Sequence, residues 1–210
     1  MSQSDAVLYT DANFFSPYAM SVFIALREKN IPFTVKPIDL SRGEHQHAAY
    51  TDISPIQRIP ALTHDGFTLC ESSAIDEYLE ELFPHSPLYP ADVRLRAQAR
   101  EVQAWLRSDL APLRAERPTE VIFNGEKRPA LSADGQAAAE KLLAVAGGLL
   151  AHGQENLFGD WCIADSDLAL MLNRLAMNGD PLPDTLQRYV QRQWQRPSLQ
   201  AWLALSAGKS

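Results

Sequence analysis

One short segment of this 210-residue chain places a hydroxyl at a helix start: Ser16-Pro17, within the run Phe14 to Tyr18. Serine is a good N-cap and proline a good first helical residue, so the pair predicts a helix that begins at Pro17. A hydroxyl there can also donate a hydrogen bond to a bound thiolate, beside the positive end of the helix dipole. The two effects sum to roughly 2–4 kcal/mol, enough to lower a thiol pKa of about 8.5 by about one to three units. The residues alone leave both interpretations open, a simple cap or a hydroxyl that stabilises an anion.

Two further segments combine polar residues with a proline or with a helix start. Pro60 stands at the entrance to an apolar run, where the missing N–H of proline costs least, and a cis bond there would turn the backbone of Ile59 outward. Glu71 precedes another helical pattern, and Ser73 with Asp76 is similar to a capping box. Local structure alone also explains each of these segments.

The composition is that of an ordinary folded protein, with 46% hydrophobic and 21% charged residues. Lys and Arg number 19 against 26 Asp and Glu, and the net charge of −7 disfavours binding to nucleic acid or to an anionic membrane. Cys70 and Cys162 lie far apart and outside any Cys/His cluster, which argues against a disulfide scaffold, a metal site and a dithiol centre. Together with the polar residues 1–5 and the lack of a long apolar run, this predicts a cytoplasmic protein.

Residues 6–82 predict a small α/β module that positions the polar segments. Four apolar runs have strand character: residues 6–10, 33–38, 61–64 and 68–70. Asp65-Gly66 between the last two is typical of a tight hairpin turn. Helical spacing of apolar residues occurs at 19–26 and 75–82, so the predicted order is β-α-β, a loose segment, a hairpin and a helix.

Beyond this module the strand signals vanish. Three prolines between Phe83 and Pro90 predict a linker at residues 84–90. The remainder, 91–210, shows only helical stripes, at 95–113, 142–149, 168–175 and 199–203. The stretch 116–135 contains two prolines and two glycines and predicts a loop between long helices.

In this order the pieces resemble the cytosolic glutathione S-transferases: a serine at the first helix start, Ile-Pro before a strand, Glu-Ser before a helix, and a helical second half. The resemblance covers the whole chain and is densest from Ser16 to Ser73 and from Trp161 to Leu170. The amino-acid sequence at Phe14 to Tyr18 and at 103–110 is similar to that of the small bacterial YfcF-type group. The resemblance implies a thioredoxin-like, glutathione-binding domain at 1–83 and an all-helical domain at 91–210 that lines the acceptor-substrate pocket.

The resemblance also implies a role for single residues toward glutathione. Glu71 would bind the γ-glutamyl ammonium, and Ser72 at a helix N-terminus would take the adjacent carboxylate. Ile59, ahead of a cis Pro60, would pair its backbone with the cysteinyl amide as an added strand. His45 would bind the glycyl carboxylate.

Arg58 matches a basic position that serves the same carboxylate as His45. Ser16 would be the catalytic residue that contacts the glutathione sulfur, and Tyr9 is its rival, because other classes use a tyrosine at the end of the first strand. Four residues of the helical half could touch a second substrate, although most of them also have a structural interpretation: Trp105, Arg107, Ser108 and Arg117.

One position departs from the family pattern. The capping segment in the core of the helical domain usually starts with Ser or Thr, and here Cys162 takes that place. Because a thiol is a poor acceptor for a backbone N–H, we expect Asp165 to carry more of the capping.

The implied function is a glutathione transferase in which an activated thiolate attacks an electrophilic small molecule, with glutathione as co-substrate and no metal or other cofactor. Two alternatives stay open. One is a glutathione-dependent hydroperoxide reductase in the same site, and the other is a non-catalytic glutathione-binding or interaction module. A homodimer is expected by family analogy.

Overall fold

In a computed structural model, residues 5–207 are described, and they form two compact units. Residues 5–88 together with 201–207 make the first unit, and residues 89–200 make the second. The first contains all the strands that the structure describes, and the second is helical. This confirms the predicted fold class, a thioredoxin-like α/β domain and an all-helical domain.

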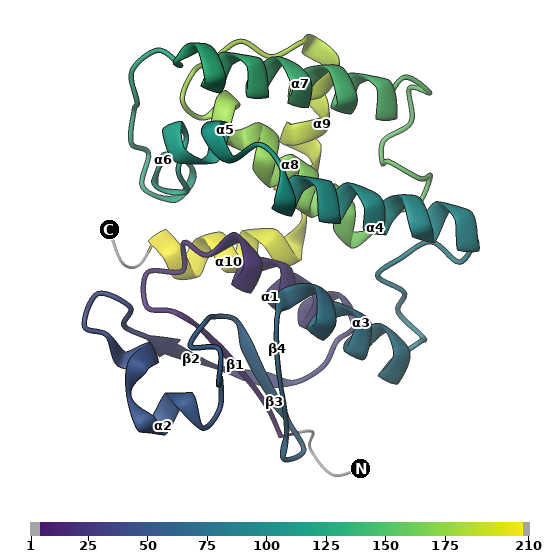
Figure 1. The fold of residues 1–210 in the computed structure, drawn as a ribbon. Helices are drawn as coiled ribbons and strands as arrows, with labels where there is room; N and C mark the ends of the chain where they lie inside the picture. Colours follow the sequence, from purple (N-terminus) through teal and green to yellow (C-terminus); the bar gives the residue numbers. More distant parts are fainter. Residues whose placement is uncertain (1–4, 208–210) are drawn as a thin grey trace. The chain divides into compact units, whose positions relative to one another are not determined.

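The first unit is built on a four-stranded sheet with the order β2-β1-β3-β4 (Figure 1). Strand β1 (Ala6–Asp11) pairs in parallel with β2 (Phe33–Ile38) and antiparallel with β3 (Ala61–His64). Strand β3 forms a hairpin with β4 (Phe67–Cys70). Asp65 and Gly66 both have positive φ, 48° and 80°, as the predicted Asp-Gly turn requires.

Helices cover both faces of this sheet. Helix α1 (Pro17–Glu28) and helix α3 (Ser72–Leu82) lie on one face (Figure 1). On the other face Tyr9 and Ala61 belong to a buried cluster with Tyr50, which comes from the short helix α2 (Ala48–Thr51) after the 3-10 turn η1 (Glu44–Gln46). The sequence analysis missed both short elements, because three or four residues are too few to show a period.

Buried polar contacts tie α1 to α3. The Ser21 hydroxyl donates to the Asp76 carboxylate at 3.0 Å, and the Lys29 ammonium lies 2.7 Å from the Glu80 carboxylate. Lys29 also donates to the carbonyls of Phe83 and Ser86, at 2.8 Å each. All three ammonium hydrogens therefore have an acceptor, which is the condition under which a buried charge is tolerated.

The end of helix α10 (Pro197–Ala207) belongs to the first unit, whereas the sequence analysis placed it in the helical domain. Trp202 is fully buried, and its ring meets the rings of Phe14 and Phe23 edge-on, with centroids 5.5 and 5.4 Å apart. Aromatic pairs of this kind contribute beyond their buried area. Helical periodicity shows that a helix has an apolar face but not which domain that face packs against.

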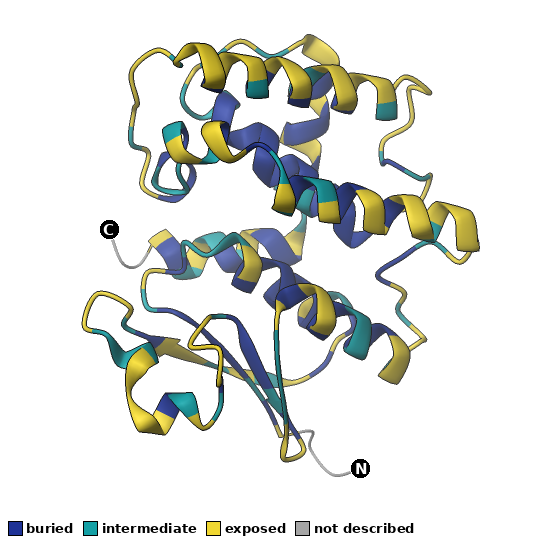
Figure 2. Cartoon of the chain, viewed as in Figure 1, coloured by how far each residue is buried: buried dark blue, intermediate teal, exposed yellow. Residues whose placement is uncertain are grey.

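Helix α8 (Ile163–Ala176) is buried along nearly its whole length and forms the centre of the second unit (Figure 2). Its neighbours are α4 (Val93–Ser108), α6 (Glu120–Phe123), α7 (Ala133–Leu149) and α9 (Asp184–Trp194). Helix α5 (Ala111–Glu116) packs on α7. Among residues 5–207, no helix is both long and apolar enough to span a membrane.

The helical half differs from the sequence prediction at three places. The apolar stripe 95–113 is not one helix, because the chain breaks at Asp109 and Leu110, where Leu110 has a φ of 60°. The predicted loop 116–135 contains α6 and the start of α7. Helix α9 was not predicted, although its buried Leu186, Tyr189 and Val190 have helical spacing.

Candidate functional site

The strand register brings four chain segments to one end of the sheet. Asp11 pairs with Ile38, so β1 and β2 finish together. Ala61 pairs with Tyr9 near the end of β1 and with Cys70 at the end of β4. We call this the site end of the sheet, defined by Asp11, Ile38, Ala61 and Cys70. The loops that carry the predicted site residues all leave from here: 12–16, 39–47, 54–60 and 71–72.

Ser16 is the N-cap of α1, as predicted. Its hydroxyl oxygen accepts from the backbone N–H of Ala19 at 3.2 Å, and Pro17 occupies the first helical position. A serine hydroxyl has one hydrogen to donate as well as lone pairs to accept with. Among the described residues, no acceptor takes the Ser16 hydrogen, so the capping role leaves the donor available to a ligand.

A positive φ shapes the loop before Ser16. Phe14 has a φ of 59°, a region that bulky side chains rarely adopt. The Asp11 carboxylate accepts from the backbone N–H groups of Phe15 and Ser16, at 2.7 and 3.1 Å. The sequence analysis missed Asp11, although an acid at the end of an apolar strand, five residues before the serine, was a visible signal.

The segment before Pro60 is held through one carbonyl. The hydroxyls of Tyr50 and Ser54 both donate to the backbone oxygen of Arg58, at 2.7 and 2.9 Å. Burial raises the pKa of Tyr50 to about 12, so this hydroxyl keeps its proton at neutral pH. The Ser54 oxygen in turn accepts from the Arg58 N–H and from the Cys70 thiol. Neither Tyr50 nor Ser54 was predicted, because a single sequence does not show that their partner is a backbone group.

The peptide bond between Ile59 and Pro60 is cis, as the resemblance implied. Pro60 is buried, and Ile59 is half-buried next to the first residue of β3. Among residues 5–207, no backbone hydrogen bond occupies the N–H or C=O of Ile59. This backbone is therefore open to an extended ligand that adds itself beside the sheet.

Glu71 and Ser72 begin α3 directly after β4. Glu71 is the N-cap, with a φ of 69°, and its exposed side chain makes no capping bond. Ser72 is buried at the first helical position. The capping box expected from Ser73 and Asp76 is absent, because the helix starts one residue earlier and Asp76 accepts from Ser21 instead.

His45 and Arg58 lie on separate loops, and no contact joins them to each other among the described residues. His45 sits in η1, after a turn in which the Asp39 carboxylate accepts from Ser41 and from Arg42 N–H; these bonds lower the pKa of Asp39. The Nδ1 atom of His45 is buried and has no partner within residues 5–207. The Arg58 side chain is exposed.

Electrostatically, this end of the sheet is suited to anions. Helices α1 and α3, of 12 and 11 residues, both begin there and direct their free N–H groups to it. Glu71 supplies an exposed carboxylate for a cation beside them. No group of three or more His, Cys, Asp or Glu side chains in the described part of the chain is arranged to hold a metal.

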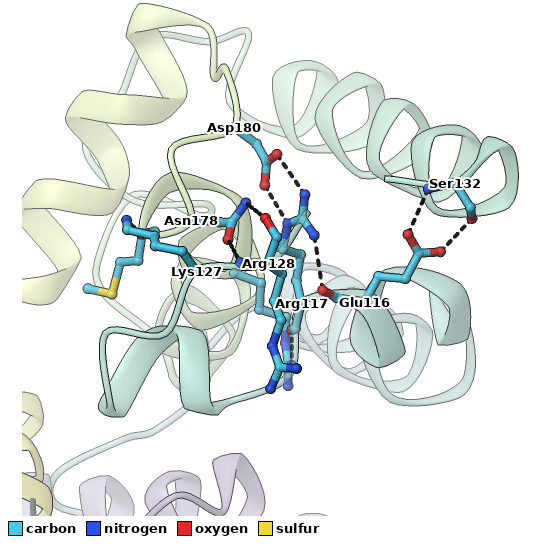
Figure 3. Close-up of polar contacts among 9 residues, drawn as sticks. Glu116, Arg117, Lys127, Arg128, Ser132, Asn178 and Asp180 are labelled. Atoms are coloured by element: carbon cyan, nitrogen blue, oxygen red, sulfur yellow. Dashed lines mark hydrogen bonds and ion pairs between the residues drawn. The ribbon is translucent and has the colours of Figure 1, made fainter. Parts of the chain in front are cut away.

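The four predicted acceptor-substrate residues lie in the second unit, and three have structural partners there. Trp105 donates to Asp109, and Arg107 pairs with Asp167 at 3.2 Å. Arg117 is buried and forms two hydrogen bonds to Asp180, at 2.6 and 2.9 Å (Figure 3). Ser108 is exposed.

Figure 3 shows that Arg117 and its partner Asp180 lie next to a group of contacts that fasten the loop between α6 and α7. Glu116 accepts from the N–H and the hydroxyl of Ser132, the N-cap of α7, and Asn178 accepts from the N–H of Arg128. The position of Arg117 beside this group favours a structural role for its guanidinium.

Asp165 caps the N-terminus of α8, as the sequence analysis expected. Its carboxylate accepts from the N–H of Cys162 at 2.9 Å, from the N–H of Leu157 at 2.8 Å and from the Tyr189 hydroxyl at 2.9 Å. Burial raises the pKa of the Cys162 thiol well above its ordinary range, so this thiol stays protonated and unreactive.

Comparison with known proteins decides the family. The chain matches the model of the glutathione S-transferase N-terminal domain over residues 14–87 and that of the C-terminal domain over residues 92–208. The chain belongs to the glutathione S-transferase family. The first match lies within the first unit, whereas the second covers most of the helical unit and also the end of α10, which belongs to the first unit.

Several curated relatives of this glutathione S-transferase chain are named as maleylacetoacetate isomerases, and several others as glutathione S-transferases. A probable maleylacetoacetate isomerase 2 of Drosophila melanogaster is 38% identical over 149 residues, or 68% of this chain and 65% of that protein. Glutathione S-transferase theta-1 of Mus musculus is 35% identical over 58% of this chain and 52% of that protein. The chain thus spans between half and two-thirds of the length of these two relatives.

Among solved structures, a glutathione transferase homologue from Burkholderia GL BGR1, crystallised with bound glutathione, is 43% identical. The match covers 97% of this chain and 99% of that one, with a TM-score of 0.82. A diazinon-metabolizing glutathione S-transferase from Bombyx mori has the same fold at 23% identity, with a TM-score of 0.81.

Proposed function

We propose that this protein is a glutathione transferase that ionises the thiol of glutathione and directs it at an electrophilic carbon. The observation that carries the proposal is that Ser16, Ile59 and Glu71 leave the sheet at the same end. The 43% identical homologue that was crystallised with glutathione supports it. In the reaction the thiol proton leaves to solvent, the sulfur forms a bond to carbon, and a leaving group departs from that carbon with its electron pair.

The polar groups at the site end match the parts of the tripeptide one by one. Glu71 binds the ammonium, and the α3 N-terminus with Ser72 binds the carboxylate beside it. The open backbone of Ile59 pairs with the cysteinyl amide. His45 and Arg58 bind the glycyl carboxylate.

Ser16 donates its free hydroxyl hydrogen to the sulfur. A hydrogen bond to a charged acceptor contributes about 1.5–3 kcal/mol, and the α1 dipole adds about 0.3–1 kcal/mol. At about 1.4 kcal/mol per unit, the pKa of the bound thiol falls by about one to three units, from about 8.5 toward neutrality. The site then holds much of its glutathione as thiolate at pH 7.

The test compares Ser16→Ala with Tyr9→Phe. Tyr9 lies in β1, is buried, and packs edge-on against Tyr50, at 5.9 Å between centroids. We expect Ser16→Ala to fold and to bind glutathione, but to lose the ultraviolet absorbance of the bound thiolate and most of its turnover with an aryl halide. Full turnover in Ser16→Ala together with loss in Tyr9→Phe would transfer the role to Tyr9.

A second candidate is the isomerisation of maleylacetoacetate, since relatives from Drosophila melanogaster, Caenorhabditis elegans and Dictyostelium discoideum are named for it. A thiolate that adds reversibly to a cis double bond permits rotation before it leaves again, so the same site serves both reactions. Isomerisation with no net consumption of glutathione would favour this candidate over conjugation.

Assays of the wild-type protein with different substrates, and its retention on immobilised glutathione, separate the remaining alternatives. Turnover of an alkyl hydroperoxide but not of an aryl halide would make the protein a glutathione-dependent reductase. Retention on immobilised glutathione without a thiolate band would make it a binding module.

The proposal extends to the setting of the enzyme. It includes a homodimer, to be checked by light scattering, and a cytoplasmic location, in keeping with two free cysteines. It also includes membership of the YfcF-type group, a linker at 84–90, and an acceptor pocket lined by the helical domain.

A further inference from the structure

Asp11 is a buried acid that the reaction described above does not use. It is the last residue of β1, and its side chain is 7% exposed. One carboxylate oxygen accepts from the N–H of Phe15 at 2.7 Å. The other accepts from the N–H of Ser16 at 3.1 Å and from the Thr10 hydroxyl at 3.1 Å. A carboxylate removed from water is tolerated only with such a set of donors.

These contacts hold the loop before α1 in a backbone conformation that is unfavourable without them. Phe14 has a φ of 59°, and a bulky residue in this region costs on the order of 1–3 kcal/mol unless its surroundings enforce the conformation. Two contacts enforce it here. The Phe14 ring packs edge-on against Trp202, and the next two N–H groups are held by Asp11.

We propose that Asp11 is a positioning residue of the thiol site, whose two carboxylate oxygens fix the backbone of Phe15 and Ser16 and thereby place the Ser16 hydroxyl against the sulfur of glutathione. This inference rests on the proposed function. Asparagine cannot replace Asp11, because its amide nitrogen is a donor and would face one of the two N–H groups.

The direction in which the pKa of the bound thiol changes when Asp11 is replaced distinguishes a positioning role from a purely electrostatic one. If Asp11 acted through its negative charge alone, removal of that charge would stabilise a nearby thiolate and lower the pKa of the bound thiol. If Asp11 positions Ser16, the same change withdraws a hydrogen bond from the thiolate and raises that pKa. A role in folding alone leaves the pKa of the bound thiol unchanged.

The experiment titrates the thiolate absorbance of bound glutathione in Asp11→Asn and Asp11→Glu. We expect the pKa of the bound thiol to rise by about one unit in both, which is about a tenfold decrease in its ionisation constant. Turnover should recover at alkaline pH, where the thiol ionises without help. Because Asp11→Glu keeps the charge but moves it by one methylene, it decides the question even if Asp11→Asn does not fold.

Glu80→Gln is the matched control. Glu80 is also a buried acid of the first unit, but its partner Lys29 caps the C-terminal end of α1, about 18 Å from Ser16 along a 12-residue helix. The control should melt earlier with an unchanged thiol pKa. An unchanged or lowered pKa in the Asp11 variants, or a raised pKa in the control, overturns the inference.

The wild-type protein tests the underlying function in the same series. Absence of glutathione binding or of a thiolate band in the wild type refutes the proposed function itself. A normal wild-type titration with Ser16→Ala impaired and both Asp11 variants unaffected refutes only the role of Asp11.

Discussion

Replacement of Asp165 by alanine should destabilise the helical unit severely without touching the thiol chemistry. The carboxylate is fully buried and accepts from the N–H groups of Leu157 and Cys162 and from the Tyr189 hydroxyl. Alanine leaves the two N–H groups without this acceptor, and the Tyr189 hydroxyl keeps only its longer bond to the backbone carbonyl of residue 165, at 3.2 Å. Cys162 offers little help, because its thiol is a weak acceptor.

The size of the effect follows from these three bonds. An unsatisfied buried donor costs about 1–3 kcal/mol, and water that enters the space left by the carboxylate recovers part of it. A net loss of roughly 3–6 kcal/mol is a large part of the roughly 5–15 kcal/mol that stabilises a typical protein. At about 2–4 °C per kcal/mol for a chain of this size, the melting temperature should fall by roughly 6–24 °C.

Thermal melting followed by circular dichroism measures this loss, with the thiolate titration recorded at low temperature. Asp184→Ala is the control, since Asp184 is an exposed acid in the first turn of α9 and interacts mainly with the helix dipole. That variant should lose at most about 1 kcal/mol, or about 4 °C. A melting temperature of Asp165→Ala as close to the wild type as that of the control, or lost activity in a fully stable Asp165→Ala protein, would refute the reasoning.

Two other predictions concern the Arg58 carbonyl and the acid range. Tyr50→Phe and Ser54→Ala each remove one hydroxyl that donates to that carbonyl, so the KM for glutathione should rise roughly two- to tenfold with little change in kcat. Thr51→Ala is the control, because it removes an exposed hydroxyl from the same helix as Tyr50. An equal rise in KM in this control would contradict the assignment. The bond from Lys141 holds the pKa of Asp109 at about 2 against an ordinary 3.8. A lowered folded-state pKa stabilises the protein above the ordinary value and less as pH falls toward 2. The difference in unfolding free energy between wild type and Asp109→Asn should therefore be constant above about pH 5 and shrink below pH 4; a difference that grows on acidification contradicts this.

The parts of the fold that the sequence predicted are those with local causes. The Asp65-Gly66 turn needs residues that tolerate positive φ, and Ser16-Pro17 suits a helix start by its own chemistry. Other parts depend on distant partners and were missed for that reason. Nothing near Trp202 in the chain indicates that its ring packs on Phe14 and Phe23.

The candidate site divides in the same way. Residues that would face the ligand, such as Ser16 and Glu71, lie beside recognisable caps and turns, so their patterns were visible. The residues that hold these loops in place were missed, although the position of Asp11 at the end of an apolar strand was a partial signal. Asp11 and Tyr50 act on backbone groups four to eight residues further along, and their function depends on a loop shape that the sequence does not display.

The edge-on packing of Trp202 on Phe14 gives the protein a built-in optical reporter. The indole lies in the fully buried part of α10, and the ring it touches belongs to the loop that delivers Ser16. Any ligand that shifts this loop changes the surroundings of the indole and hence its fluorescence. A variant that retains Trp202 while Trp105, Trp161 and Trp194 are replaced by phenylalanine would therefore follow occupancy of the site in solution without an added label.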